Sequence, residues 1–404
     1  MSFQQGLSGL NAAAKNLDVV GNNVANASTV GFKSSTAQFA DVFANSLAGA
    51  GGVQVGIGTT ISRVNQNFTQ GNISTTANAL DIAINGKGFF RMNNNGAITY
   101  QRNGQFMLDN AGYVVNATGQ RLTGYPPAPG GGVITATPQD LRIDFSDIPP
   151  SITTLAQVVS NLDSRMSALN PALFNMNDAT TYSSATSLTT YDTLGNPHTL
   201  TLYYLKTAAN TWDVFGANDG VQLGAGALGT VTFNPDGSLA AGANIPISAP
   251  VTTGAVTPMA YTVDLTGTTQ FGSNFGVNQL TQDGYSSGRI AGYSVAADGM
   301  MLARYTNGQS RTLGQVALAD FVNPQGLQPL GNNQWAETPE SGQPLVGAPD
   351  SASLGVLQSG AVEDSNIDLT AELVSLITAQ RVYQANAQTI RAQDQILQTL
   401  VNLR

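Results

Sequence analysis

Two narrow apolar stripes, one near each end of the chain, constrain the fold more than any other feature of the sequence. The first recurs at alternating steps of four and three residues, at Phe3, Leu7, Leu10, Ala14, Leu17, Gly21 and Val24. The second recurs in the same way at Leu369, Leu373, Leu376, Gln380, Tyr383, Ala387, Ile390, Asp394, Leu397 and Val401. This spacing is typical of helices that pack against another helix along a seam. We therefore expect two terminal helices that pair, parallel or antiparallel, and leave other faces to neighbouring molecules.

The two predicted helices differ in how well they would form alone. Gly6, Gly9 and Gly21 each weaken the first helix by about 1 kcal/mol relative to alanine. No glycine or proline interrupts residues 361–404, where Ser365 followed by Asp368 predicts a capping-box start. At about 1.5 Å per residue, this second helix would be roughly 55–60 Å long. We expect both ends to be disordered in the single chain and to fold when copies assemble.

The composition favours a surface that other copies of the chain cover. Charged residues make up only 10% of the 404 residues, against about 25% in ordinary soluble proteins. The net charge of −9 argues against nucleic-acid binding, and the absence of cysteine excludes disulfides and thiolate chemistry. We expect no Sec-type signal peptide, because no basic stretch is followed by an apolar run near the N-terminus. We also expect no membrane span.

Between the ends, short alternating stretches separated by turn residues predict nested β domains. Strands are expected at residues 80–84, 88–92, 97–101, 105–109 and 112–116, with tight turns at 85–86, 95–96, 103–104 and 110–112. Residues 49–58 read as a flexible or tightly turned linker. In the central part, hairpins are expected around residues 194–197 and 234–237, with Leu200, Leu202 and Tyr204 on one face and a third strand at 211–217. Alternation returns at residues 289–295, 300–306 and 314–321.

These patterns predict an α+β multidomain chain in which paired, coiled-coil-like terminal helices enclose nested, mainly β domains. The expected parts are a terminal helical domain (1–30 with 365–404), an extended linker (31–70), an inner β domain (71–145 with 285–364) and an inserted outer β domain (146–284).

The residues that carry chemistry do not gather into a recognisable site. His198, the one histidine, follows a proline beside a predicted hairpin turn, so we expect a solvated turn residue rather than a catalytic base. Residues 224–229 match the letters of a dinucleotide-binding loop, but a strand-like stretch follows instead of a helix. The acidic residues are scattered. We therefore predict no catalytic, cofactor or metal site and no enzymatic activity.

Three segments resemble a known family. The predicted first helix runs into an Asn-rich motif with Asn22, Asn23 and Asn26, followed by Gly31 and Phe32. This stretch is similar to the N-terminal signature of bacterial flagellar rod and hook proteins. Residues 366–403 look like the C-terminal signature of that family, and residues 79–92 resemble a third shared stretch. The resemblance covers both ends and the flanking β regions but not the middle.

The resemblance implies a structural subunit that polymerises, and the large insert between residues 145 and 284 favours the hook over the shorter distal rod subunit. The hook is a flexible tube that transmits torque from the rod to the filament. The family's partners would be the distal rod protein, the hook cap, the hook–filament junction protein and the export apparatus, which exports chains without a cleaved signal. A secreted β-rich adhesin is the alternative outside the family. The assembly residues would be Phe3, Leu7, Leu10, Leu17 and Val24 in the first helix, and Leu369, Leu373, Leu376, Tyr383, Ile390, Leu397 and Val401 in the second.

Overall fold

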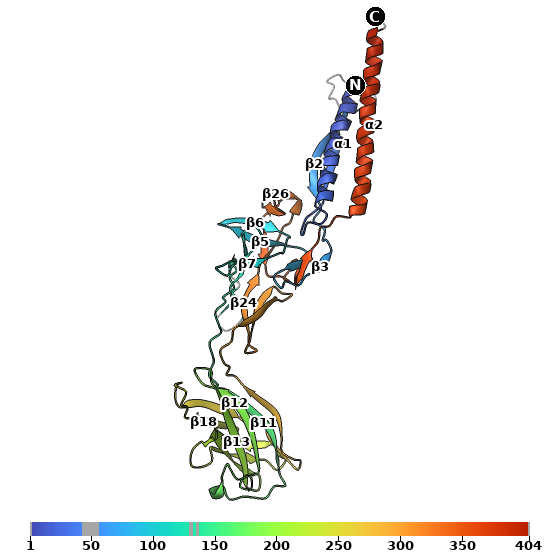
Figure 1. The fold of residues 1–404 in the computed structure, drawn as a ribbon. Coiled ribbons are helices and arrows are strands. Elements are labelled where there is room, and N and C mark those ends of the chain that lie inside the picture. Colours follow the sequence, from blue (N-terminus) through green and yellow to red (C-terminus); the bar gives the residue numbers. More distant parts are fainter. Residues whose placement is uncertain (1, 43–55, 129–131, 135–136, 403–404) are drawn as a thin grey trace. The chain divides into compact units, whose positions relative to one another are not determined.

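The computed structural model describes residues 2–42, 56–128, 132–134 and 137–402, with side chains described from residue 3 to residue 399 within these ranges. The chain divides into two compact units (Figure 1). The first, here called the helix–sheet unit, contains residues 1–145, 292–304 and 310–404. The second, here called the insert unit, contains residues 146–291 and 305–309. Terminal helices with mainly β structure between them are confirmed. Most of the predicted linker at residues 49–58 lies outside the described residues.

The two terminal helices pair as predicted, and they run antiparallel. Helix α1 spans Ser2–Ala25 and helix α2 spans Leu369–Asn402, side by side in Figure 1. Gly6 of α1 lies against Ile390 of α2, whereas Asn23, near the other end of α1, reaches Glu372 at the start of α2. With 34 residues, α2 is roughly 50 Å long.

The predicted capping box at Ser365 is wrong. Helix α2 begins three residues later, where the Asp368 carboxylate accepts hydrogen bonds from the amides of Thr370 (2.9 Å) and Ala371 (3.1 Å). A side-chain oxygen at this position satisfies amides that have no partner inside the helix. Ser365 itself is buried and forms part of the strand-to-helix connection.

Among its described residues, the helix–sheet unit contains three strand pairs outside its main sheet. One follows α1 in the sequence, and the other two join the N-terminal part of the chain to the C-terminal part. Strands β1 (Ser35–Val42) and β2 (Gly58–Gln66) form an antiparallel pair beside α1, in the segment 31–70. Strand β3 (Ile73–Thr75) pairs with β30 (Ala361–Glu363), and β4 (Ile82–Asn85) pairs with β29 (Val356–Ser359). The last two pairings bring residues near 80 against residues near 360.

The main sheet of this unit has strand order β22-β23-β24-β9-β5-β6-β27-β26. Its strands are β5 (Phe89–Asn94), β6 (Ala97–Gln101), β9 (Arg121–Tyr125), β22 (Ile290–Val295), β23 (Met300–Tyr305), β24 (Ser310–Val316), β26 (Gln328–Gly331) and β27 (Gln334–Ala336). Shorter strands join it: β7 (Met107–Leu108), β8 (Val114–Val115), β10 (Gln139–Asp140), β25 (Leu318–Asp320) and β28 (Leu345–Gly347), with a short helix at Pro324–Gly326. The strands predicted at 289–321 therefore return to pair with β9 and β5.

The predicted Asn-Gly turns had mixed outcomes. Asn95 and Gly96 form the hairpin between β5 and β6, with φ angles of 51° and 100°. The turn at 110–112 joins β7 and β8, which also pair. The other two expectations are wrong. Residues 85–86 connect β4 to β5, which pair with different strands. Gly104 serves a close approach instead, because a Cβ there would lie 1.7 Å from the Ile82 carbonyl oxygen.

The insert unit is a β sandwich with its core between two sheets. The six-stranded sheet contains β12 (Ser184–Tyr191), β13 (Pro197–Ala208), β14 (Thr211–Asn218), β15 (Val221–Gln222), β16 (Gly229–Phe233) and β17 (Leu239–Ala241). The five-stranded sheet contains β11 (Leu155–Asp163), β18 (Asn244–Ala249), β19 (Met259–Asp264), β20 (Thr269–Phe271) and β21 (Gly276–Gln282), and a short helix spans Pro171–Leu173. The predicted hairpins and the inward face of Leu200, Leu202 and Tyr204 are confirmed.

The prediction that His198 is a solvated turn residue is wrong. Its side chain is only 5% exposed and lies between two carboxylates, with Nδ1 2.6 Å from Asp219 and Nε2 3.3 Å from Asp192. Burial disfavours the charged imidazole, but the hydrogen bonds to Asp219 and Asp192 outweigh it and raise the pKa of His198. Asp192 is fully buried and also accepts hydrogen bonds from Thr253 and Asn196. The group is a hydrogen-bonded network that is buried at His198 and Asp192 and reaches the surface at Asp219.

Candidate assembly surface and its root

The large apolar residues of the predicted stripe on α1 are only partly covered by the chain itself. Phe3 and Leu7 remain 46% and 44% exposed, and Leu10, Leu17 and Val24 are half-buried. The residues most deeply buried on this helix are instead Gly6, Ala13, Val20 and Asn23. These positions lie beside the stripe, and in the N-terminal half of α1 they are the small residues Gly6 and Ala13.

The predicted stripe on α2 is more exposed still. Leu369, Leu373, Tyr383 and Leu397 are between 37% and 53% exposed. Leu376 and Ile390 are half-buried, and Ile390 lies against Gly6 of α1. Ala379 is the buried residue of this helix among those with described side chains. The side chain of Val401 lies outside the described residues. Four further apolar residues of α2 that the sequence analysis missed are about half exposed or more: Val374, Ile377, Val382 and Ile396.

Small residues let the two helices approach closely. A Cβ at Gly6 would lie 3.1 Å from Ile390 Cγ1, and one at Gly9 would lie 2.8 Å from Asn386 Oδ1. Where larger residues flank the contact, the helices leave an apolar groove of about 280 Å³ whose lining includes Ala13, Val374 and Val382. The pair therefore buries its small residues within one chain and presents its large ones outward. Exposed apolar side chains of this size make the helix pair a candidate interaction surface.

The Asn-rich motif forms the root of α1. The Asn23 side chain is fully buried and pairs with the backbone of Ser35, donating to its carbonyl (2.8 Å) and accepting from its amide (3.0 Å). It also donates to Glu372 of α2. Asn26 donates to the Asn22 carbonyl, as expected of a turn that ends a helix. One motif side chain thus joins α1, β1 and α2.

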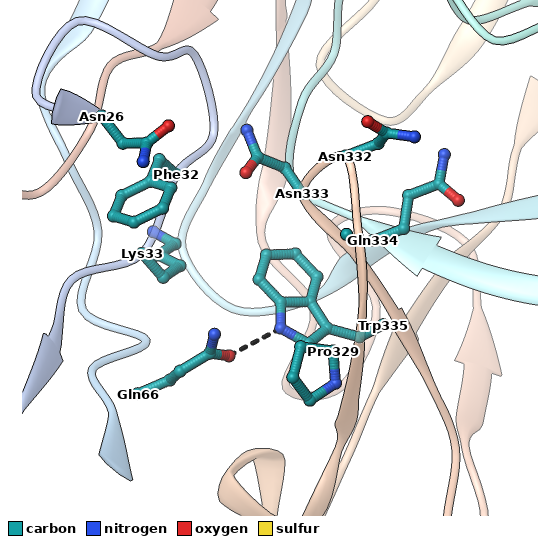
Figure 2. A pocket seen from close by; sticks show the side chains of 10 residues that line it. Asn26, Phe32, Lys33, Gln66, Pro329, Asn332, Asn333, Gln334 and Trp335 are labelled. Atoms are coloured by element: carbon teal, nitrogen blue, oxygen red, sulfur yellow. Dashed lines mark hydrogen bonds between the residues drawn. The ribbon is translucent and has the colours of Figure 1, made fainter. Parts of the chain in front are cut away.

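Gly31 and Phe32 complete the root. Gly31 has a φ of +71°, and a Cβ there would lie 2.5 Å from the amide nitrogen of Asn103. Figure 2 shows Phe32 with Asn26 on one side of a cavity of about 240 Å³ and Asn333 with Trp335 on the other. Trp335 Nε1 donates to Gln66 at 2.7 Å, as the dashed line marks. The hydrogen bond ties the main sheet to the end of β2 beside this cavity.

A buried ionic cluster lies beside this cavity, and sequence reasoning missed it. Lys33 Nζ is 2.6 Å from Glu363 Oε1, and Arg102 Nη1 is 2.9 Å from Glu363 Oε2. The side chains of Lys33 and Glu363 are fully buried, and that of Arg102 is 5% exposed. Burial, assisted by the positive Arg102, lowers the pKa of Lys33 against the opposing attraction of Glu363.

The described residues show neither a metal-binding cluster nor a membrane-spanning helix. No group of three or more His, Asp or Glu side chains among them could hold a metal ion. Within the same residues, no helix combines the length and apolar character that crossing a membrane requires.

Comparisons with known families agree with this arrangement along most of the chain. Residues 3–33 match the family model "Flagella basal body rod protein", and residues 358–403 match "Flagellar basal body rod FlgEFG protein C-terminal". Residues 83–156 match "Flagellar hook protein FlgE/F/G D1 domain", and residues 161–285 match "Flagellar basal body protein FlaE D2 domain". The first two ranges contain α1 with its root and α2. The class is therefore a structural subunit of the flagellar basal body and hook.

Full-length relatives define the family more narrowly. The chain is 42% identical to the flagellar hook protein FlgE of Salmonella typhimurium and 41% identical to that of Escherichia coli, each over 100% of both chains. It is 33% identical to the hook protein of Borreliella burgdorferi over 100% of this chain and 99% of the relative. The crystal structure of Helicobacter pylori flagellar hook protein FlgE2 shares the fold, with a TM-score of 0.54 and 14% identity over 70% of this chain and 99% of that one.

The chain belongs to the flagellar hook protein family. It is a structural subunit of the hook, which belongs to the bacterial flagellum. The full-length matches favour the hook over the distal rod subunit and the adhesin that the sequence left open.

Proposed function

We propose that copies of this chain assemble through the large apolar residues that α1 and α2 leave exposed after pairing with each other. One observation carries the proposal: Phe3, Leu7, Leu373 and Leu397 each stay at least 44% exposed although their helices are already packed. A fully buried side chain of this size contributes about 1.5–3 kcal/mol, so the exposed half of each contributes about 1 kcal/mol when a neighbour covers it. Association costs an estimated 4–15 kcal/mol, so several such contacts per subunit are needed.

The remaining roles follow from this polymer. The insert unit faces its neighbours through small, weakly charged surfaces that slide as the tube bends, and the chain has no catalytic activity. The chain is exported unfolded without a cleaved signal and functions outside the cell. The distal rod protein, the hook cap and the hook–filament junction protein contact the ends of the polymer, and the export apparatus recognises the N-terminal segment. These roles are supported by family membership and by the low charge of the sequence.

The test replaces two exposed leucines on α2. Leu373→Ser with Leu397→Ser removes apolar surface, and the matched control Gln384→Ser with Gln388→Ser makes the same loss of helix propensity at exposed polar positions of the same helix. We expect the leucine variant to need an about ten-fold or higher concentration to form tubes, because about 1.4 kcal/mol corresponds to a factor of ten. Electron microscopy and sedimentation measure this. Assembly of the leucine variant at the control's concentration would contradict the proposal.

The proposal makes the two ends the assembly elements; because α1 and α2 already pair within the single chain, it does not need the ends to be disordered before assembly, as the sequence led us to expect. A chain cut to residues 31–364 is expected to stay a folded, soluble monomer. If the shortened chain still polymerised, the ends would not be the assembly elements.

A further inference from the structure

The structure assigns to Glu363 the role of a positioning residue for the assembly surface: its carboxylate ties the roots of both terminal helices to the inner β structure. Lys33 follows α1 and its motif, Glu363 ends β30 shortly before α2, and Arg102 follows β6 of the main sheet. One carboxylate therefore holds three segments that are far apart in the sequence. The inference rests on the proposed assembly role of α1 and α2.

Both oxygens of the Glu363 carboxylate accept hydrogen bonds. Oε1 accepts from Lys33 Nζ (2.6 Å) and from the Gly71 amide (2.9 Å), and Oε2 accepts from Arg102 Nη1 (2.9 Å). The Glu363 carbonyl also accepts from the Gly31 amide at 2.7 Å, beside the left-handed turn of the motif. Both main-chain and side-chain atoms of this residue thus fix the segment that follows α1.

The two cations are held by few other groups. Lys33 Nζ donates to the Thr69 carbonyl (2.7 Å), and Arg102 Nη2 donates to the Gly86 carbonyl (2.6 Å). Arg102 Nε has no hydrogen-bond partner although it is buried. In this buried cluster two positive groups pair directly with one carboxylate, with Asp320 a further attraction on Arg102, so Glu363 is the group whose loss leaves most charge uncompensated. Breaking a buried pair in this way is strongly unfavourable, whereas removing both partners costs much less.

The consequence concerns direction rather than affinity. Residues 31–35 and 364–368 are the connections through which α1 and α2 leave the β structure, and both start at this cluster. The helices contact the β structure mainly through β1 and β2, so the connections at the root set their direction. A helix can present its exposed side chains to a neighbouring copy only if that direction is the same in every copy. We therefore expect loss of Glu363 to disturb assembly without changing any residue on the assembly surface.

The experiment compares full-length chains carrying Glu363→Gln, Lys33→Met with Glu363→Gln, and the control Asp140→Asn. Asp140 also pairs with an arginine, Arg121, at 3.1 Å in the same unit, but that pair is partly exposed. The rate of hydrogen exchange at residues 31–36 and 366–372 in the unassembled chain measures how well the root is ordered. The concentration needed for tube formation measures assembly, and calorimetry measures the stability of each unit.

For Glu363→Gln we expect faster exchange at both segments and an assembly concentration raised about ten-fold or more, with the insert unit melting unchanged. The double variant removes one of the two cations that lose their carboxylate partner but leaves Arg102, so it should restore part of the melting of the helix–sheet unit. It should not restore assembly, because the tie to Lys33 is still missing. If the double variant assembled like the natural chain, Glu363 would only balance charge and the inference would be wrong.

A third variant covers the case in which Glu363→Gln does not fold. Glu363→Asp keeps the charge but is one methylene shorter, so it should fold, exchange faster at the root and assemble at an intermediate concentration. An opened root with normal assembly in this variant would overturn the inference. The exchange readout does not depend on which residues neighbours contact. Failure of the serine variants on α2 to affect assembly would therefore count against the proposed function alone.

Discussion

The insert unit and the terminal helix pair differ in how far they cover their large apolar side chains. In the insert unit, Leu202 and Trp212 are fully buried between two sheets of the same chain. In the helix pair, Leu373 and Leu397 stay about half exposed, and glycine and alanine occupy the contact. The insert unit therefore has a core of its own, whereas the helix pair leaves large apolar side chains for which the proposed assembly supplies the cover. If that proposal holds, the chain combines a domain with its own core and an element whose stability is shared among subunits.

The largest effect that would sharpen this contrast is expected in the sandwich core. Leu202→Ala removes a fully buried side chain and should lower the free energy of unfolding of the insert unit by about 2–5 kcal/mol. Calorimetry of the full chain measures the transition of this unit, with Val221→Ala, at a 61% exposed position of the same unit, as the control. A loss below about 1 kcal/mol would mean that the sandwich is not tightly packed.

The next effect concerns how α2 begins. Asp368→Ala removes the carboxylate that caps the Thr370 and Ala371 amides and should destabilise the helix by about 1 kcal/mol. Circular dichroism of the assembled and unassembled chain measures it. Ser365→Ala is the contrasting change, because Ser365 does not cap the helix. Equal losses from the two substitutions would place the helix start at residue 365 after all.

A smaller effect on the single chain is expected at the exposed stripe. Leu373→Ala should lower the free energy of unfolding of the unassembled chain by less than about 1 kcal/mol, because the side chain is already 44% exposed. The same substitution should still raise the concentration needed for tubes. If Leu373→Ala destabilised the unassembled chain as much as Leu202→Ala does, the proposed contrast between the two units would be wrong.

The smallest effect is a pH dependence confined to the insert unit. The folded state raises the pKa of His198, so its contribution to stability is fully present below about pH 6.5 and is lost as the pH rises through the folded value. Hydrogen bonds outweigh burial and lower the pKa values of Asp192 and Asp219, so their contributions decline only in acid, below about pH 4. Melting of the insert unit should therefore decrease from pH 6 to pH 8. His198→Gln should remove that slope, and a slope that persisted would assign it to other groups.

Much of the fold could be predicted from the sequence because its signals are local. The alternating four-and-three spacing of Leu369, Leu373 and Leu376 identifies a helix, and Asn95-Gly96 identifies a hairpin because both residues adopt positive φ. The same reasoning could not identify the line of contact between the helices. That line depends on Gly6 and Gly9. In the sequence alone these glycines indicate only a weak helix. Their role in the close approach of α1 and α2 becomes visible once α2 is known to be the partner.

The root of the assembly surface was the least predictable part. Asn23 and Lys33 stand within a recognisable motif, but Glu363 is separated from Lys33 by 330 positions. Its flanking residues look like any strand end. The prediction for His198 was wrong for the same reason. Asp192 is close to it in sequence, but Asp219 and Thr253 reach the site from other elements. Local patterns therefore identify elements, and long-range polar contacts decide which residues hold them together.

The two strand pairs, β3 with β30 and β4 with β29, have a consequence for how such chains diversify. They hold together the two ends of the segment 86–355, which is therefore one long loop closed by these pairs. The entropic cost of closing a loop grows only slowly with its length. A lineage can therefore enlarge, trim or exchange the parts of this loop that do not contact the root, as long as residues such as Arg102, Asn103 and Trp335 keep their places there.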